Sequence, residues 1–561
     1  MKLKQKRPGK IAAMVVICLP VLVAMAAIVM DGGLGMGEHL NLQHAADSAS
    51  TAAAASLHAG NDPGVARDTA YDMVANGQGM DDANVIVNIP PQSGQYAGQD
   101  GYVEVLADEE YNSIFSGAID GVFSRTIKVS SVSGIVPNPN GGVISVLDPD
   151  PAHISFDSVQ NLIANLDQTA LVDAAISQLD TTGIAIGPLS IPGTLATVLG
   201  LVQDTLGDTV SDLLDTELLD TVSAICPPLL TLAGGMEVEG LGRLNVNGAV
   251  HVNHEGGRFD EKGKAAGSGP LPPYGLSCMP LLSTTRLAAK YMHVVGGVDN
   301  PANYLPYNTA DKDPLRCNQR PVDDPLASLP IPSAGAATSN GDRVTVALTA
   351  AGALTTVNAV LDSLSPLLKT LLTPLTGPII DRLNRVTLEP GVYDSLTIVS
   401  LGGSVELKPG VYIINDVSPI TQMSLCIIGS VKAEGVLFYI AKPSSYLPLP
   451  GTIQPSVLIA PLIHTCTFEG LQDGSSPYND VLLFQDRTDA RPMIIESQNL
   501  IGAGAFAGTI YNKAGHVSWV AGGGTYDVKI VSGTLRVVTV TNTTVSPDVP
   551  FPPATTVMLL E

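Results

Sequence analysis

The stretch LEPGVYDSLTIVSLGGSVELKPGVYII, residues 388–414, contains the pattern Leu-x-Pro-Gly-Val-Tyr twice, 19 residues apart. Apolar residues alternate along the segment, and each Pro-Gly pair favours a tight corner. A period near twenty with this alternation is typical of a parallel β-solenoid, in which each coil buries its inward side chains against the next. Because a solenoid needs three or more such repeats, an antiparallel β-sandwich remains the alternative.

Composition also favours a mainly β protein. Glycine (56) and proline (41) are abundant, whereas charged residues are 15% and aromatic residues 4% of the 561 residues. The net charge is −24, and five of the cations lie within the first ten residues. The chain therefore lacks the basic surface that a nucleic-acid partner requires, and its length allows two or more domains.

The N-terminus has the pattern of a membrane anchor. Residues 11–30 are twenty residues without a charge, about the length that crosses a bilayer core. The basic residues before this segment place the tail in the cytoplasm and the rest of the chain outside. A cleaved signal peptide is the alternative, since Ala24-Met25-Ala26 has the small-x-small form of a cleavage site. Both interpretations export the chain.

The stretch LQHAADSASTAAAA, residues 42–55, follows the apolar segment and predicts that its helix continues to about Leu57. Small side chains recur every three or four residues, so one face of the helix would let another backbone approach closely. We expect this face to pack against other helices, although a plain helical spacer fits the composition equally well. The predicted interface residues are Gln43, Ala45, Ala46, Asp47, Ala49, Ala52 and Ala53.

The order of these features resembles the N-terminal signature of the TadE/TadG-like proteins of tight-adherence (Flp) pilus assembly. The resemblance rests on Arg7-Pro8-Gly9, Leu19-Pro20, Asp31 and the match of residues 42–47 to that family's Leu-Gln, small-residue and aspartate motif. It continues over paired strands around Pro90-Pro91 and covers about the first 135 residues. Met14 stands where a pilin-type leader has glutamate, so cleavage by a prepilin peptidase is not implied.

The resemblance implies a single-pass protein of the bacterial inner membrane, with its N-terminus in the cytoplasm and most of the chain outside. It also implies other Tad pilus-assembly or pseudopilin-like membrane proteins as partners. The segment GTIYNKAGHVSWVAGGG, residues 508–524, looks like a recurring element of the β-helix-like C-terminal halves of larger TadG-like proteins.

The predicted fold is mainly β with helical additions: an N-terminal transmembrane helix and stalk, a small α+β pilin-like region, and a distal β-solenoid (a right-handed β-helix) or sandwich with amphipathic insertions. The predicted segments are a basic tail (1–10), a transmembrane helix (11–30), an alanine-rich helical stalk (31–75), a β-rich TadE/TadG-like region (76–156), an amphipathic helical insertion (157–234), a β and turn-rich connector (235–344), a second helical insertion (345–385) and a β-solenoid-like domain (386–561).

The cysteines suggest disulfides more than catalysis. In an oxidising compartment we expect Cys278 to pair with Cys317 and Cys426 with Cys466, although connectivity cannot be deduced from sequence. Absence of a Cys-x-x-Cys pattern disfavours redox chemistry and structural zinc.

The remaining polar residues offer little chemistry. His251 and His254 would point to opposite faces of a strand, so they predict no metal site. The best catalytic candidate is the group Asp486, Arg487, Asp489 and Arg491, which we expect to form surface ion pairs instead.

The sequence therefore predicts no enzyme, no cofactor and no metal. It predicts a membrane-anchored, extracytoplasmic, TadG-like structural component of a Flp/Tad pilus, or of a related secretion and adhesion apparatus in the cell envelope. The alternative is a surface-anchored β-helix domain that binds or cleaves envelope polysaccharide. That function would require aromatic and acidic residues along a groove, and the chain has one tryptophan and nine phenylalanines.

Overall fold

The computed structural model describes residues 10–80, 83–112, 124–137, 141–149, 234–349, 385–444, 454–497, 505–553 and 555–560, with gaps at 270, 281–284, 310–312, 334–336 and 462–465, and single positions within 121–178 and 358–384. The predicted helical insertions, 157–234 and 345–385, lie almost wholly outside these residues. The chain forms two compact units, Met1–Pro139 with Thr555–Glu561, and Asn140–Ala554.

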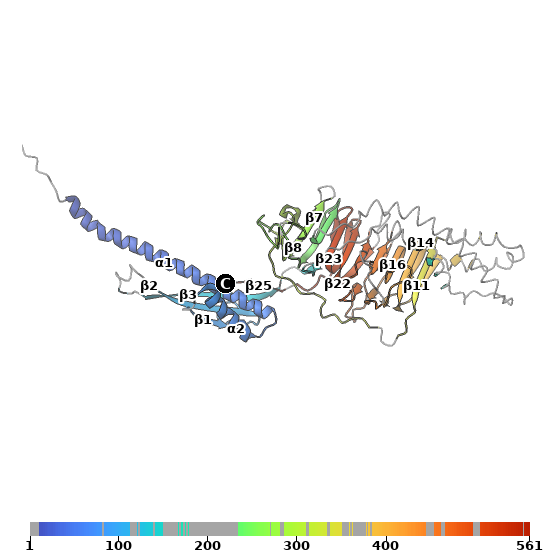
Figure 1. Cartoon of the computed structure of the whole chain (residues 1–561), viewed down its shortest axis with the longest axis horizontal. Coiled ribbons are helices and arrows are strands. Elements are labelled where there is room, and N and C mark those ends of the chain that lie inside the picture. Colours follow the sequence, from blue (N-terminus) through green and yellow to red (C-terminus); the bar gives the residue numbers. More distant parts are fainter. Residues whose placement is uncertain are drawn as a thin grey trace, which may run out of the picture. The chain divides into compact units, whose positions relative to one another are not determined.

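The first unit, which we call the N-terminal module, is one long helix on a four-stranded sheet (Figure 1). Helix α1 (Lys10–His58) continues without a break past the apolar segment, as predicted. Helix α2 (Pro63–Asp72) follows, begun by the Asp62 side chain, which accepts hydrogen bonds from two main-chain N–H groups of the first turn. A π-helical turn (Met73–Gly77) ends the helical part.

The sheet of the N-terminal module is antiparallel, with strand order β1-β2-β3-β25. Its strands are β1 (Asn84–Asn88), β2 (Tyr102–Asn112), β3 (Ser124–Pro137) and β25 (Thr555–Leu559). Thr555 lies opposite Pro137, and Leu559 lies opposite Ser133. Strands β3 and β25 therefore form a hairpin in which the whole second unit replaces the turn.

The second unit is a parallel β-solenoid with three faces, so the solenoid interpretation was right and the sandwich was not. The first face consists of β11 (Asp342–Leu348), the start of β14 (Ser395–Leu407), the start of β16 (Leu425–Ala433), β18 (Val457–Ala460), β21 (Met493–Glu496), the end of β22 (Ala505–Ala521), the end of β23 (Gly524–Thr539), β5 (Gly234–Gly240) and β7 (Tyr274–Pro280).

The second face consists of β12 (Arg385–Leu388), the ends of β14 and β16, β19 (Thr467–Glu469), the starts of β22 and β23, β24 (Thr543–Val545), the starts of β6 (Leu244–Val252) and β8 (Leu287–Val294), and β9 (Tyr304–Pro306). The third consists of β13 (Gly391–Tyr393), β15 (Gly410–Ile414), β17 (Val436–Ile440), β20 (Val481–Gln485), the middles of β22 and β23, β4 (Gly142–Val146), the ends of β6 and β8, and β10 (Leu315–Arg316).

The order of the coils in space differs from their order in the sequence. The end of β23 pairs with β5, and its middle pairs with β4, so the N-terminal strands of the solenoid continue the stack built by its C-terminal strands. Figure 1 shows this as green strands β7 and β8 beyond the red strands β22 and β23. One coil is composite, because β23 and β24 supply two of its faces and β4 the third.

These pairings correct the predicted boundaries. The solenoid begins at β4 rather than at residue 386, its strands include most of the predicted connector 235–344, and residues 555–559 belong to the N-terminal module. The Leu-x-Pro-Gly-Val-Tyr pattern itself occurs only within residues 388–414. Coil lengths vary, from 18–20 residues between β22 and β23 to 40 residues between β5 and β7, so one sequence period does not mark all the coils.

The tyrosines of the repeated pattern close its corners. Tyr393 donates to the carbonyl of Glu389 at 2.6 Å, and Tyr412 donates to the carbonyl of Lys408 at 2.8 Å, in each case four residues back. The two rings stack with centroids 6.2 Å apart. Each copy therefore satisfies a corner carbonyl with its own hydroxyl, while the stacked rings fill the space between coils.

A segment that we call the strap, residues 317–333, joins the last coil strand, β10, to the first, β11, at the other end of the stack. It was predicted as a turn-rich connector. Val322 exchanges two main-chain hydrogen bonds with the side chain of Asn253, at 2.9 and 2.8 Å. Further along, Asp324 accepts from the Tyr511 hydroxyl at 2.7 Å. The strap is therefore fixed to coils that lie far apart in the sequence.

The outer edge of β11 is covered by one side chain. The Gln178 amide donates to the carbonyl of Asp342 at 2.8 Å and accepts from the N–H of Val344 at 2.9 Å. These two bonds copy the pairing of a further strand. An unprotected edge would invite pairing with another chain, so Gln178 acts as a cap for the stack.

Gly429 allows the bend inside β16 and provides the first prediction. Its φ is +89°, and a Cβ there would lie 1.8 Å from the carbonyl oxygen of Ser400. Gly429→Ala should lower the free energy of unfolding of the solenoid by about 3 kcal/mol or more, because it combines backbone strain with a backbone clash. The measurement is denaturant unfolding followed by fluorescence of Trp519, the single tryptophan, which is fully buried in the solenoid.

The matched control is Gly263→Ala, since Gly263 also has a positive φ (+76°) but has open space around the added Cβ. This change should lower the free energy of unfolding by about 1 kcal/mol, because it adds backbone strain without a clash. Equal losses for the two variants would contradict a role for the contact with Ser400.

Candidate functional site

The first half of α1 is exposed and apolar. From Met14 to Met30 its large side chains have exposed fractions between 52% and 73%. Helix α1 is long and apolar enough to cross a membrane, by its length and composition. No other described part of the chain covers this half of the helix, which makes it the natural candidate for contact with lipid or partner helices.

The helix enters the N-terminal module at Asp31, whose side chain is buried, with 3% exposed. Four residues later, Gly35 lies against Tyr111 at the end of β2, since a Cβ there would come within 2.8 Å of the tyrosine hydroxyl. On the other side of the helix Leu34 and Met36 stay exposed, at 51% and 66%. An apolar strip therefore extends beyond the span on the side that faces away from the sheet.

The alanine-rich face of α1 packs inside the module. Of the predicted interface residues, Ala45, Ala46, Ala49 and Ala53 have no exposed surface, and Gln43, Asp47 and Ala52 are half-buried. The four buried alanines belong to an apolar cluster with valines of β2 and β3 and alanines of α2. The prediction that this face packs against other proteins' helices is therefore corrected: the chain's own sheet and α2 cover it.

Polar side chains fix α1 to β3. The Gln43 amide donates to Asp47 at 2.7 Å and to the carbonyl of Ser130 at 3.1 Å. One turn further on, the Ser50 hydroxyl lies 2.8 Å from the hydroxyls of both Ser131 and Ser133, and all three are buried. We call these six residues, 43, 47, 50, 130, 131 and 133, the helix lock.

The helix lock determines the position of α1 on β3, which small residues alone do not. An alanine face buries little apolar area, so directional bonds set which part of β3 it meets. Sequence reasoning identified Gln43 and Asp47 as interface residues but assigned them to a partner, and it missed the serines. The sequence did contain a sign of this contact, because Ser131 and Ser133 are two residues apart and so share one face of a strand.

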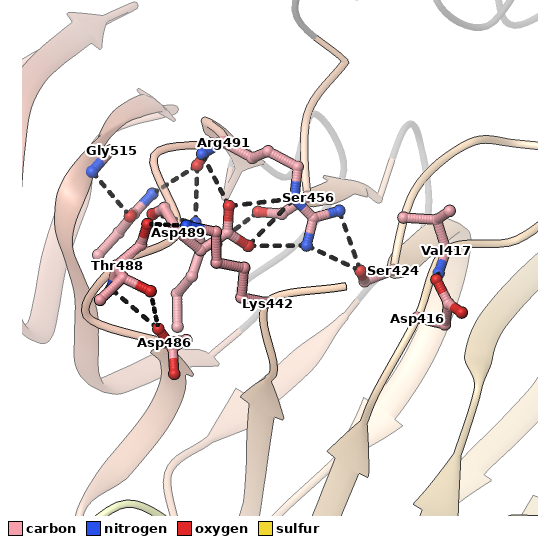
Figure 2. Close-up of polar contacts among 12 residues, drawn as sticks. Asp416, Val417, Ser424, Lys442, Ser456, Asp486, Thr488, Asp489, Arg491 and Gly515 are labelled. Atoms are coloured by element: carbon pink, nitrogen blue, oxygen red, sulfur yellow. Dashed lines mark hydrogen bonds and ion pairs between the residues drawn. The ribbon is translucent and has the colours of Figure 1, made fainter. Parts of the chain in front are cut away.

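Two of the four charged residues predicted on the surface, Asp489 and Arg491, are buried. Figure 2 shows their polar contacts. Arg491 and Asp489 form an ion pair at 2.8 Å with 3% and 4% of their side chains exposed. The guanidinium also lies 3.2 Å from the hydroxyl of Ser424, at the corner of another coil. The prediction of a surface ion pair is thus wrong. The buried pair contacts a corner two coils away, because β18 lies between β16 and β21 on the first face.

The other two members of that group point elsewhere. Arg487 donates to the carbonyls of Leu326 and Leu329, at 2.8 and 2.6 Å, and so holds the strap. Asp486 accepts from the N–H and hydroxyl of Thr488; burial raises the pKa of this carboxyl, but these bonds outweigh it and leave the pKa below its usual value. The four residues therefore do not converge on a common point.

The four cysteines predicted in disulfides are buried free thiols in the structure. Cys466 lies in the core cluster with Leu425 and Ile427, whereas Cys426 stands between these two on the opposite face of β16. Their side chains therefore point to different sides of the strand, which prevents the predicted bond. Cys278 and Cys317 do not pair either, and their N–H groups donate separately to Asp299 and Glu261.

The solenoid histidines His251 and His254 are both buried. His251, 2% exposed, has a pKa lowered to about 3 by burial and then by the nearby His293 ring, whose centroid is 5.7 Å away. The ring of His254 accepts from the N–H of Gly256, and no group of three metal-binding side chains occurs among the described residues. His254 lies beyond the end of β6 (Leu244–Val252), so the prediction that the two histidines point to opposite faces of one strand does not apply to it.

His516 is the second histidine that burial keeps neutral. It has no exposed surface, and burial, followed by the charge of Arg536, lowers its pKa to about 3. Its Nδ1 lies 2.8 Å from the hydroxyl of Thr534. The folded solenoid therefore cannot take up the protons that these imidazoles bind in the unfolded chain near pH 6.5.

A cavity of about 900 Å³ lies beside β9 and β10, with Glu261, Tyr304 and Arg316 among its lining residues. The Tyr304 hydroxyl donates to Asp299 at 2.5 Å, and Arg316 donates to two main-chain carbonyls. Glu261 accepts from a main-chain N–H at 3.2 Å. The polar groups of Glu261, Tyr304 and Arg316 thus serve the fold of the last coils.

Gln43→Ala should loosen the N-terminal module by about 1–2 kcal/mol, because it removes both bonds of the amide and leaves a partly buried carboxylate without its donor. The measurement is hydrogen exchange of β3 in the whole chain. His44→Ala, at the adjacent exposed position, is the control and should change exchange little. Equal protection in both variants would contradict the role of the helix lock.

The solenoid should lose stability in acid. For each of His251 and His516 the pKa is near 3 in the folded chain and near 6.5 in the unfolded chain. Below pH 6.5 the unfolded chain therefore binds protons that the folded chain does not, and the free energy of unfolding falls as the pH drops. At pH 5 each histidine should have lowered the free energy of unfolding of the solenoid by about 2 kcal/mol relative to neutral pH. The measurement is denaturant unfolding at pH 7.5 and 5, followed by Trp519 fluorescence.

The double variant His251→Gln and His516→Gln should flatten this pH dependence relative to the unchanged chain. His44→Gln, in an exposed position of α1, should not. The same slope in the double variant and the unchanged chain would rule out the two buried imidazoles as its cause.

Comparison with known proteins identifies only the N-terminal part. The Tad family model, described as Flp pilus-assembly TadE/G-like, matches residues 9–56. No curated protein and no solved structure matches the chain. The match covers α1 almost from end to end, including the exposed span and the residues of the helix lock on this helix. Residues 9–56 are therefore similar to the TadE/G-like Flp pilus-assembly family.

Proposed function

We propose that the chain is a membrane-anchored, extracytoplasmic and non-catalytic structural component of a Flp/Tad pilus, or of a related secretion and adhesion apparatus. One observation carries the proposal: the TadE/G-like segment is a single helix whose first half is exposed and apolar and whose second half is docked on its own sheet. Such a helix joins a membrane or helical assembly to a folded extracytoplasmic module.

The charges near the N-terminus support the orientation. Lys2, Lys4, Lys6, Arg7 and Lys10 precede the span, and Asp31 and Glu38 follow it. Cationic residues stay on the cytoplasmic side of single-span proteins, so the module and the solenoid lie outside. We assign the chain to the inner membrane of a bacterial cell envelope on this basis and on the family of residues 9–56.

The partners would meet α1 on the face that the module leaves exposed. The alanine face is buried, so Leu34, Met36 and Leu40 remain for contact just beyond the span, with exposed fractions of 51%, 66% and 48%. Gly33 and Gly37 lie along the same stretch with nothing within 4 Å of an added Cβ. Other Tad pilus-assembly or pseudopilin-like helices fit this surface, because small and apolar residues let helices pack closely.

A non-catalytic role agrees with how the charged groups of the solenoid are used. Arg487 holds the strap, and Arg491 with Asp489 joins coil corners. Arg536 pairs with Glu237 at 2.8 Å, again between buried side chains. Buried pairs of this kind position backbone, so these arginines and their carboxylate partners serve the fold.

The alternative, a domain that binds or cleaves polysaccharide, finds less support. It would need exposed aromatic side chains beside free carboxylates. The cavity near β9 has one aromatic ring, Tyr304, which is buried and whose hydroxyl is already bonded. No observation on the described residues favours this second function.

The test is site-specific photo-crosslinking in living cells. A photoreactive residue at Met36 should capture other single-span pilus-assembly proteins, because this position is exposed on the proposed contact face. The control is the same residue at Val65 on α2, which is 45% exposed but lies outside that face, and it should not capture them. Equal capture at both positions, or capture of lipid alone at Met36, would contradict the assembly role.

A further inference from the structure

The last strand of the chain completes a domain formed by its first residues. Strand β3 ends at Pro137, and the chain returns to pair with it only at Thr555. The second unit, Asn140–Ala554, lies between them in the sequence. The N-terminal module therefore lacks one strand of its sheet until the C-terminus arrives.

Strand β25 is part of the structure that holds α1. It pairs with β3 through residues 555–559, and the N–H of Leu560 extends the pairing with a bond of 2.8 Å to the carbonyl of Val132. Helix α1 packs against β25, and Val557 joins the apolar cluster that contains the buried alanines. Leu559 pairs with Ser133, which belongs to the helix lock.

The folded solenoid holds its first and last residues next to each other, and β25 follows the last of them. The N–H of Phe551 donates to the carbonyl of Gly142 at 2.8 Å, so the residues by which the chain enters and leaves the solenoid lie side by side. This juxtaposition depends on the composite coil, where β4 from the start of the solenoid pairs with β23 from its end. Without that coil, the two ends of the solenoid have no fixed separation.

We propose that β25 is a completion strand: the N-terminal module closes only after the solenoid has folded and returned the end of the chain to β3. The physical reason is loop entropy. Before the solenoid folds, pairing β25 with β3 must close a loop of residues 138–554, whose cost grows with length and which a five-residue strand cannot offset. After the solenoid folds, the connections that remain are about as short as those of an ordinary hairpin.

In a chain that is exported from its N-terminus, the sheet of the N-terminal module is completed late. The span and α1 are made first, but the helix lock gains its full sheet only when the last residues have left the membrane. An incomplete or misfolded solenoid would leave the edge of β3 unpaired between Val132 and Pro137. The closed module thereby reports that the solenoid is folded and that β25 has reached β3, whatever the module then assembles with.

The two units can be monitored separately. Ser50→Cys with Ser133→Cys places a cysteine pair where two hydroxyls lie 2.8 Å apart, so disulfide formation reports closure of the module. The bond is identified by mass spectrometry of its peptides, which separates it from the native cysteines. Trp519, fully buried and bonded to Ser497 at 2.7 Å, reports folding of the solenoid.

The first experiment removes residues 555–561 from the chain with the cysteine pair. We expect native Trp519 fluorescence and at least a tenfold lower rate of disulfide formation, restored by adding a synthetic peptide of residues 555–561. Removal of Glu561 alone is the control and should change neither signal. A truncated chain that forms the disulfide as fast as the whole chain would overturn the proposal.

The second experiment keeps β25 and unfolds the solenoid. In the Gly429→Ala background, denaturant should abolish the Trp519 signal at concentrations that leave the unchanged solenoid folded. Disulfide formation between positions 50 and 133 should fall together with that signal. Persistence of rapid disulfide formation after the Trp519 signal is lost would show that the module closes without the solenoid, and the proposal would be wrong.

Discussion

The pairing of β23 with β4 and β5 is the constraint on which the rest of the arrangement depends. These ladders join strands separated by most of the chain, and they place the entry and exit of the solenoid next to each other at Gly142 and Phe551. A linear stack that began at one end and finished at the other would separate its termini by its whole length. Because the stack is permuted instead, a solenoid can occupy the position of a hairpin turn.

The permutation also explains the strap. A stack whose chain starts in the middle must return from one end to the other. Residues 317–333 make that return, with Leu326 and Leu329 packed against apolar residues of the third face. The bonds from Arg487 to two strap carbonyls and from Tyr511 to Asp324 satisfy polar groups of an extended segment that has no strand partner. The charged residues that looked most like a catalytic group in the sequence serve this path and the coil corners.

The sequence predicted the parts of the fold that rest on local patterns. Hydropathy and alanine spacing placed α1 to within a residue or two, and the Leu-x-Pro-Gly-Val-Tyr repeat identified the coil, including the two tyrosines that close its corners. The composite coil, the strap and the return of β25 were missed. Each depends on pairing between distant segments, and β4 and β25 are ordinary short apolar strands with no local sign of their partners.

The alanine face of α1 shows why a correct local pattern led to the wrong partner. Small residues indicate close approach of another backbone but do not say whose, because they carry no shape or charge that selects it. The selecting groups are the serine hydroxyls of β3 and the Gln43 amide, and they are informative only once β3 is known to face the helix. Since this face is used within the chain, the contacts that we propose with other membrane proteins would use the opposite side of α1, where Leu34, Met36 and Leu40 are exposed.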